Sequence, residues 1–101
     1  MRYAVNSELA EADLADIWVE IATDDIDTAD QFIERLRTLA QKLAEQPLMG
    51  RERPELGKDV RVFPHGQYLL IYRLTAHGVG IARVVHGARD IAHVEVPRPD
   101  A

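Results

Sequence analysis

Several kinds of residue and segment are missing from this sequence, and each absence removes a class of protein. Its 101 residues include no cysteine, which excludes disulfides, zinc sites built on thiolates and a cysteine nucleophile. No apolar run approaches the roughly 18 residues of a membrane span. Residues 1–6 carry no hydrophobic signal segment, so we expect a cytoplasmic protein that is not secreted and has no membrane partner.

Motifs for phosphate, nucleotide and metal binding are missing as well. The sequence has no Gly-rich phosphate loop and no nucleophile elbow. Its four histidines are His65, His77, His86 and His93, and no two of them have the i, i+4 spacing of helical metal ligands. We therefore expect neither a metal site nor a cofactor.

The length and the apolar fraction of 47% fit one globular domain, which we place at residues 1–96, with a flexible tail at 97–101. The net charge of −5 argues against bulk nucleic-acid binding, and we expect no direct sequence-specific DNA binding. The charge is uneven: the first fifty residues hold eleven acids and four bases, and the rest hold six acids and eight bases. Two interpretations are open: the acids simply solvate exposed helix faces, or the polarised chain presents its basic side to a partner.

Two segments have the apolar period of amphipathic helices. The first spans 8–23, with Ser7 as its N-cap, and its apolar stripe is Leu14, Ile17, Trp18 and Ile21. The second spans about 27–46 and ends before Pro47, and its stripe is Ala29, Phe32, Ile33, Leu36, Leu39, Ala40 and Leu43. The short break between the two segments predicts an antiparallel helical hairpin.

The remaining segments alternate apolar and polar residues, as strands do. A short strand is expected at 2–6 and a loop at 48–58; the later strands are expected at 59–63, 68–75 and 79–86, with turns at 64–67 and 76–78. The predicted class is α+β, a short strand, a two-helix hairpin and a three-strand antiparallel meander (β-α-α-β-β-β) packed on the helices. The sheet face away from the helices must then be wet or bound by something else.

Charged residues gather where the last strand ends. Arg83, His86, Arg89 and Asp90 lie within eight positions. Arg61 and Arg73, on neighbouring strands, share a face with Arg83 if the register allows it; the cluster is Arg61, Arg73, Arg83, His86, Arg89 and Asp90. Arginines and a histidine can cleave RNA, because the histidine moves protons and the arginines neutralise charge at phosphorus. The cluster can equally be a binding surface, or a structural Arg–Asp pair that seals the end of the sheet.

An ordered set of short motifs resembles the ParE branch of the RelE/ParE toxin superfamily, the toxins of bacterial type II toxin–antitoxin pairs. The resemblance covers about residues 2–91. Its motifs are Asp13-Leu14, Ile17-Trp18, Ala29, Phe32-Ile33, Leu43, Pro47, Gly50-Arg51, Arg61, Tyr68, Leu70-Ile71-Tyr72 and the run from Arg83 to Asp90. The order of elements read from the pattern is also the fold of that family.

The resemblance implies a toxin that a co-expressed antitoxin neutralises. ParE-like members stall DNA gyrase, whereas RelE-like members cut mRNA on the ribosome, often with a tyrosine near the C-terminus. No tyrosine follows Tyr72 here, and net negative charge suits RNA poorly. We therefore favour a gyrase inhibitor without catalytic residues. An mRNA endonuclease using Arg61, Arg83 and His86 remains an alternative, as does a degenerate, non-toxic antitoxin-binding module.

The resemblance also implies two contact surfaces in a toxin–antitoxin hetero-oligomer. We assign the charged cluster at the end of the last strand to gyrase. Antitoxins are largely disordered segments that fold on their toxin, and we expect the antitoxin on the exposed sheet face and in grooves beside the helical hairpin. The residues assigned to it are Trp18, Leu48, Met49, Arg51, Tyr68 and Tyr72. Trp18 can alternatively be an ordinary core residue.

Overall fold

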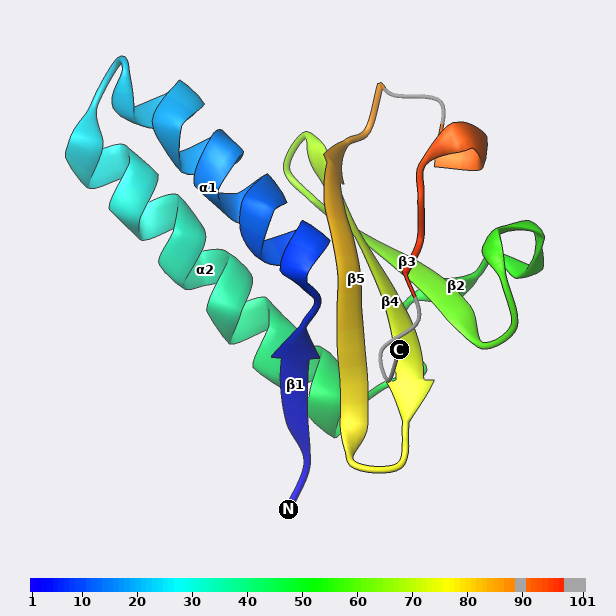
Figure 1. Ribbon diagram of the computed structural model, residues 1–101. Helices are drawn as coiled ribbons and strands as arrows, with labels where there is room; N and C mark the ends of the chain where they lie inside the picture. Colours follow the sequence, from blue (N-terminus) through cyan, green and yellow to red (C-terminus); the bar gives the residue numbers. More distant parts are fainter. Residues whose placement is uncertain (89–90, 98–101) are drawn as a thin grey trace.

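The chain forms one sheet with a helical hairpin on one of its faces (Figure 1). The fold is that of a computed structural model, which describes residues 1–88 and 91–97. Its elements are β1 (Tyr3–Asn6), α1 (Glu8–Ala22), α2 (Ile26–Glu45), β2 (Arg51–Glu52), the 3-10 helix η1 (Pro54–Leu56), β3 (Val60–His65), β4 (Tyr68–Thr75), β5 (Gly78–His86) and the 3-10 helix η2 (Ile91–His93). This order confirms the predicted α+β class and the helical hairpin.

The sheet has five strands in the order β1-β5-β4-β3-β2. The antiparallel meander of β3, β4 and β5 confirms the prediction, and β1 joins it by pairing in parallel with β5. The prediction of a plain loop at 48–58 is wrong, because Arg51 and Glu52 pair with Val62 and Arg61 to form β2. The predicted turn at 64–67 is also too long, since β3 continues through His65.

The two helices begin at capping side chains that the sequence supplies. The Ser7 hydroxyl accepts the backbone N–H of Ala10 at 3.0 Å and donates to the carbonyl of Ala82 at 2.7 Å, so it caps α1 and ties it to β5. The Asp25 carboxylate accepts the N–H of Asp27 at 3.2 Å at the start of α2. Each helix then buries one stripe, Leu14 and Ile17 in α1, and Ala29, Leu36, Ala40, Leu43 and Ala44 in α2.

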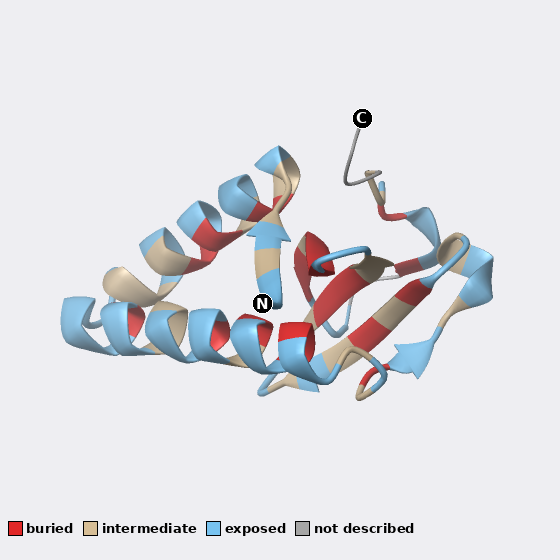
Figure 2. Cartoon of the chain, turned by 90° about the horizontal axis from the view of Figure 1, so that it is seen from below, coloured by how far each residue is buried: buried red, intermediate tan, exposed pale blue. Residues whose placement is uncertain are grey.

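Each face of the sheet has its own apolar cluster (Figure 2). The first lies between the helices and the sheet and includes Leu43, Leu70, Tyr72 and Ile81. The second lies on the opposite face and consists of Val60, Val62, Ile71, Ala82, Val85, Ile91 and Val94. The alternation along β4 therefore buries both of its sides, as the sequence predicts.

The second face is covered by the chain itself, which corrects the expectation of an exposed sheet face. Residues 91–97, which we call the C-terminal strap, run back over this face, and Ile91 and Val94 enter its apolar cluster. Arg73 donates to the carbonyls of Val96 and Pro97. Pro97, the first residue of the predicted flexible tail, is therefore bound by Arg73. The other residues of that tail, 98–101, lie outside the described residues.

One carboxylate joins the helical hairpin to the sheet. Strand β1 pairs with β5 only as far as Ile81, and beyond it Asp13 of α1 takes over the edge of β5. Its carboxylate accepts two bonds from Arg83, at 2.7 and 2.9 Å, and one from the N–H of Val84 at 2.9 Å. The two side chains are only 12% and 13% exposed, and the bond to Asp13 raises the pKa of Arg83. Asp13 thus satisfies the N–H of Val84 at a point on β5 that β1 does not reach.

Asp13→Ala should destabilise the chain strongly, because it leaves a largely buried guanidinium and a strand N–H without their acceptor. We expect a loss of about 2–4 kcal/mol in the free energy of unfolding, measured by urea denaturation. Asp16→Ala, on an exposed position of the same helix, is the matched control and should change stability by less than about 0.5 kcal/mol. Equal stability of the two variants would contradict this role of Asp13.

A second prediction concerns Tyr72, whose side chain is 0% exposed. Its hydroxyl accepts the N–H of Gly50 at 2.8 Å and donates to the carbonyl of Pro47 at 2.7 Å, which fixes the chain after α2. A Cβ at position 50 would lie 2.5 Å from that hydroxyl, so only glycine fits there.

Tyr72→Phe should cost about 1–3 kcal/mol of stability, because it strands a buried N–H. The matched control is Tyr68→Phe, which removes a hydroxyl for which the described structure shows no hydrogen bond. Thermal unfolding of both variants should give a clearly lower Tm only for Tyr72→Phe; similar losses in both would argue against the anchoring role.

Candidate functional site

The three strand arginines do not share a face, so that expectation is wrong. In the register of the sheet Arg61 lies opposite Tyr72, whose ring faces the helices, whereas Arg73 lies opposite Val60 on the far side. Arg83 lies opposite Ile71, also on the far side, and reaches Asp13 over the edge of β5. A register fixes the face of every residue, and it is set by pairing that sequence spacing does not reveal.

Each of these arginines is bound by the chain itself. Arg61 donates to the carbonyl of Gly50 at 2.7 Å and to the carboxylate of Glu52 at 3.0 Å. Arg73 donates to the carbonyl of Lys58 at 2.9 Å and to the strap, and Arg83 is held by Asp13 and by the carbonyl of Glu95 at 3.1 Å. Their observed contacts are therefore structural, and binding of a target by these side chains stays a prediction.

Of the four cluster members that the structure describes, His86 is the exposed one. Its Nδ1 accepts the N–H of Ala88 at 3.1 Å, so the neutral ring carries its proton on Nε2, which lies 3.3 Å from the Oε1 of Gln67. The ring meets Tyr68 edge-on, with centroids 5.4 Å apart. Arg89 and Asp90, the other predicted members at this end of β5, lie outside the described residues.

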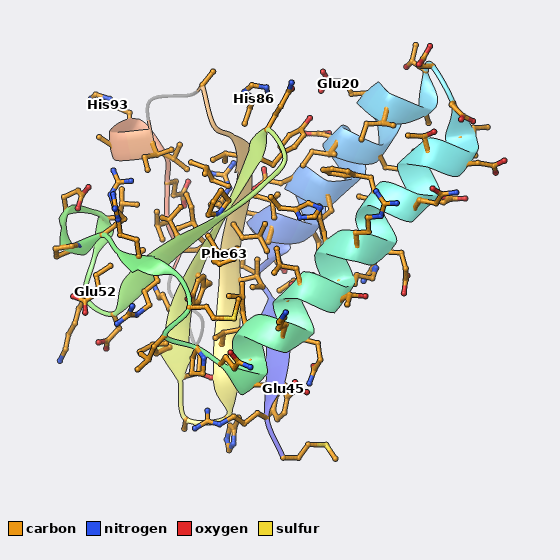
Figure 3. All side chains as sticks on the ribbon, turned by 180° about the vertical axis from the view of Figure 1, so that it is seen from behind. Glu20, Glu45, Glu52, Phe63, His86 and His93 are labelled. Carbon is orange, nitrogen blue, oxygen red and sulfur yellow. The ribbon has the colours of Figure 1, made fainter. Side chains whose placement is uncertain are left out.

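His86 belongs to a row that the sequence analysis did not find. His65, Tyr68 and His86 are direct cross-strand partners on β3, β4 and β5, and Phe32 of α2 packs on both His65 and Tyr68, with centroids 5.6 and 5.5 Å away. Burial and the charge of Glu20 raise the pKa of Tyr68, and Glu20 and His86 lie toward the same end of the molecule (Figure 3). The only available signal was the strand alternation, and assigning His65 to a turn concealed it.

The residues assigned to an antitoxin differ widely in accessibility. Leu48 is 65% exposed and Arg51 is exposed. Met49 and Tyr68 are half-buried against the first apolar cluster. Trp18 is also half-buried, and its Nε1 donates to Asp30 of α2 at 2.8 Å, so it bridges the two helices at their surface. Tyr72 is fully buried, which corrects its assignment as a contact residue, since the folded chain offers none of its surface.

Two surface hollows flank α2 and the outer edge of the sheet. One, of about 520 Å³, lies between α2 and His65 at the end of β3. The other, of about 350 Å³, lies beside β2 and β3 and is lined by Met49 and Phe63, among others. Within residues 1–88 and 91–97, no three His, Asp or Glu side chains converge so as to hold a metal ion. No helix among these residues has the length and apolar character needed to cross a membrane.

Comparisons with known proteins agree with this architecture. The family model for the ParE toxin of the type II toxin–antitoxin system parDE matches residues 5–91. "Toxin ParE1" of Mycobacterium tuberculosis, in two strains, is 31% identical over 88 residues, which cover 84% of this chain and 89% of that protein. A solved structure titled "Chromosomal ParDE TA system from P. aeruginosa" superposes with a TM-score of 0.69 at 18% identity, covering 85% of this chain and 96% of that one. The solved structure supports the fold alone. The family model and the relative in M. tuberculosis match most of the sequence, and they show that the chain belongs to the ParE toxin family of type II toxin–antitoxin systems.

Proposed function

We propose that this toxin inhibits DNA gyrase, and so DNA replication, in the cytoplasm, and that a cognate antitoxin neutralises it in a hetero-oligomeric complex. The family match over residues 5–91 supports the toxin–antitoxin role. We favour gyrase over the ribosome because of the hydrogen bonds of Arg61, Arg73 and Arg83. These arginines donate to carbonyls and a carboxylate of the chain itself. A ribonuclease needs such cations directed at the scissile phosphate.

The nuclease alternative with Arg61, Arg83 and His86 loses support from the same geometry. His86 lies in a row with Tyr68 and His65, while Arg61 is bound beside the chain that follows α2, and Arg83 is paired with Asp13. The nearby charge that acts on Tyr68 is that of Glu20, which would repel a phosphodiester. Among residues 1–88 and 91–97, the general acid–base group His86 is thus not accompanied by Arg61 or Arg83, the cations that the nuclease reading pairs with it.

We assign the gyrase contact to the end of β5. His86 is exposed there, and Arg89 and Asp90 follow it in the sequence. Arg61, Arg73 and Arg83 then serve this surface indirectly, because they hold the loop after α2, the strap and the β5 edge in place. The antitoxin contact is assigned to the exposed or half-buried residues near α2, namely Leu48, Met49, Arg51, Trp18 and Tyr68.

Expression of the chain alone should stop growth, and co-expression with its antitoxin should restore it. Pulse labelling should show thymidine incorporation falling before methionine incorporation, because a gyrase poison blocks replication first. An early collapse of methionine incorporation would favour the ribosome as target. Harmless expression without antitoxin would indicate a degenerate, non-toxic module.

His86→Ala should weaken inhibition of purified gyrase several-fold in a supercoiling assay while the chain stays folded, since the side chain is exposed and its bonds are peripheral. His77→Ala, on the exposed turn at the opposite end of β5, is the matched control and should inhibit like the parent. If the parent chain instead cuts mRNA in a translation extract and His86→Ala abolishes the cleavage, the gyrase proposal fails. Truncation after Val85 would not test the gyrase contact, because it also removes the strap that covers the second apolar cluster.

A further inference from the structure

The turn between β3 and β4 lies against the end of β5. His65 pairs with Tyr68 across this turn, and Tyr68 also pairs with His86 of β5. Beyond these pairs the N–H of Gly87 donates to the carbonyl of Gln67 at 2.7 Å, and a Cβ on Gly87 would lie 3.2 Å from the same carbonyl oxygen. The turn and the end of β5 therefore form one joined unit, and Figure 3 shows His86 near the tip of the hairpin that links β3 and β4.

The local sequence fixes the shape of this turn. Gly66 and Gln67 are the two residues between the paired His65 and Tyr68. Gly66 has a φ of 59°, which glycine adopts without steric cost and which a two-residue hairpin turn needs at its first position. Phe32 of α2 packs on both flanking residues, with ring centroids 5.6 and 5.5 Å away. The turn thus starts from a packed base, which holds Gln67 beside β5.

Both ring nitrogens of His86 have partners within the chain. Nδ1 accepts the N–H of Ala88 at 3.1 Å, and Nε2 lies 3.3 Å from the Oε1 of Gln67. An accepting Nδ1 leaves the proton of the neutral ring on Nε2, and this N–H donates to the amide oxygen of Gln67. The edge-on contact with Tyr68 limits rotation of the ring. Gln67 and Ala88 therefore set the tautomer and the orientation of an exposed side chain.

Gln67 uses its backbone and its side chain for different bonds. Its carbonyl accepts the N–H of Gly87, whereas its amide oxygen accepts the ring N–H of His86. The side chain is exposed, so its removal frees the His86 ring while the backbone bond stays in place. A side chain that is already ordered in the free protein loses less rotamer freedom when a partner binds it. A bond of this kind can therefore raise the affinity for a target without contacting it.

We propose that Gln67 is a positioning residue for the target contact, and that the β3–β4 turn forms one target-binding surface with the end of β5. The inference rests on the proposed gyrase contact at His86 and adds how that side chain is held before gyrase binds. Gln67 keeps the His86 ring in the Nε2–H tautomer and in one orientation. Gyrase then meets a surface that is preorganised in the free toxin.

A double-mutant cycle tests whether Gln67 acts through His86. Gln67→Ala should raise the concentration of the chain that inhibits gyrase supercoiling about fourfold, the loss expected for one hydrogen bond. In the His86→Ala background the same substitution should change that concentration by less than about 1.5-fold, because the bonded ring is gone. Gln46→Ala is the matched control and should inhibit like the parent, since Gln46 is exposed and follows Glu45, which lies at the opposite end of the molecule (Figure 3). Circular dichroism verifies that all variants are folded.

NMR of the free chain with isotope-labelled histidine gives a readout that does not depend on gyrase. The ring nitrogen shifts of neutral His86 should report the Nε2–H tautomer in the parent and in Gln46→Ala, and a mixture of both tautomers in Gln67→Ala. Unchanged shifts in Gln67→Ala, or an equal loss of inhibition in both backgrounds of the cycle, would overturn the positioning role and leave the proposed function intact. A parent chain that shows the expected shifts but does not inhibit gyrase would overturn both, since there would be no target contact to position.

Discussion

The structure depends most on the Asp13 carboxylate, which meets Arg83 and the N–H of Val84 at the point where β1 stops pairing with β5. Together with the Ser7 hydroxyl and the apolar contacts of the first cluster, this group fastens α1 to the sheet. It also orients Arg83, whose other donor reaches the carbonyl of Glu95 in the strap. Helical hairpin, sheet and strap are thereby connected through one largely buried ion pair. One apolar cluster lies on each face of the sheet that this pair joins to α1 and to the strap.

The same structure shows that an arginine found in the sequence is not always free to bind a partner, because its donors can be used within the fold. Arg61, Arg73 and Arg83 form the most suggestive cationic set in the second half of the chain, yet each of them donates to an oxygen of the chain itself, the carbonyl of Gly50, the carbonyl of Lys58 and the carboxylate of Asp13, respectively. In the part of the chain that the structure describes, Arg35 and Lys42 of α2 and Arg51 of β2 form no ion pair. The proposed antitoxin contact near α2 and the proposed gyrase contact near His86 then involve different residues from these three arginines.

The helices and the meander are predictable from the sequence because they follow local periods. The apolar stripes place α1 and α2 to within about one residue of their bounds, and turn residues separate β4 from β5. The faces of the arginines are not predictable, because strand pairing sets them. Arg61 pairs with Tyr72, so Arg61 and Arg73 lie on opposite faces, and a register shift between Ile71 and Tyr72 moves β5 relative to β4. The strap has no regular pattern, and β2 is only two residues long, so both arise from tertiary contacts. The place of His65 beside Tyr68 was missed because the sequence assigned His65 to a turn, whereas β3 continues through it.

Hydrogen–deuterium exchange on the complete chain, alone and with antitoxin or gyrase, tests the central claim that the two partners use surfaces away from the strand arginines. The account predicts that antitoxin slows exchange in 46–53, which contains the proposed contacts Leu48, Met49 and Arg51, and that gyrase slows it near the end of β5. The strap and the middle of β4 should exchange as they do in the free chain. Protection that is confined to the strap and β4 with either partner would contradict the account, since it would place the contact on the arginine-held face.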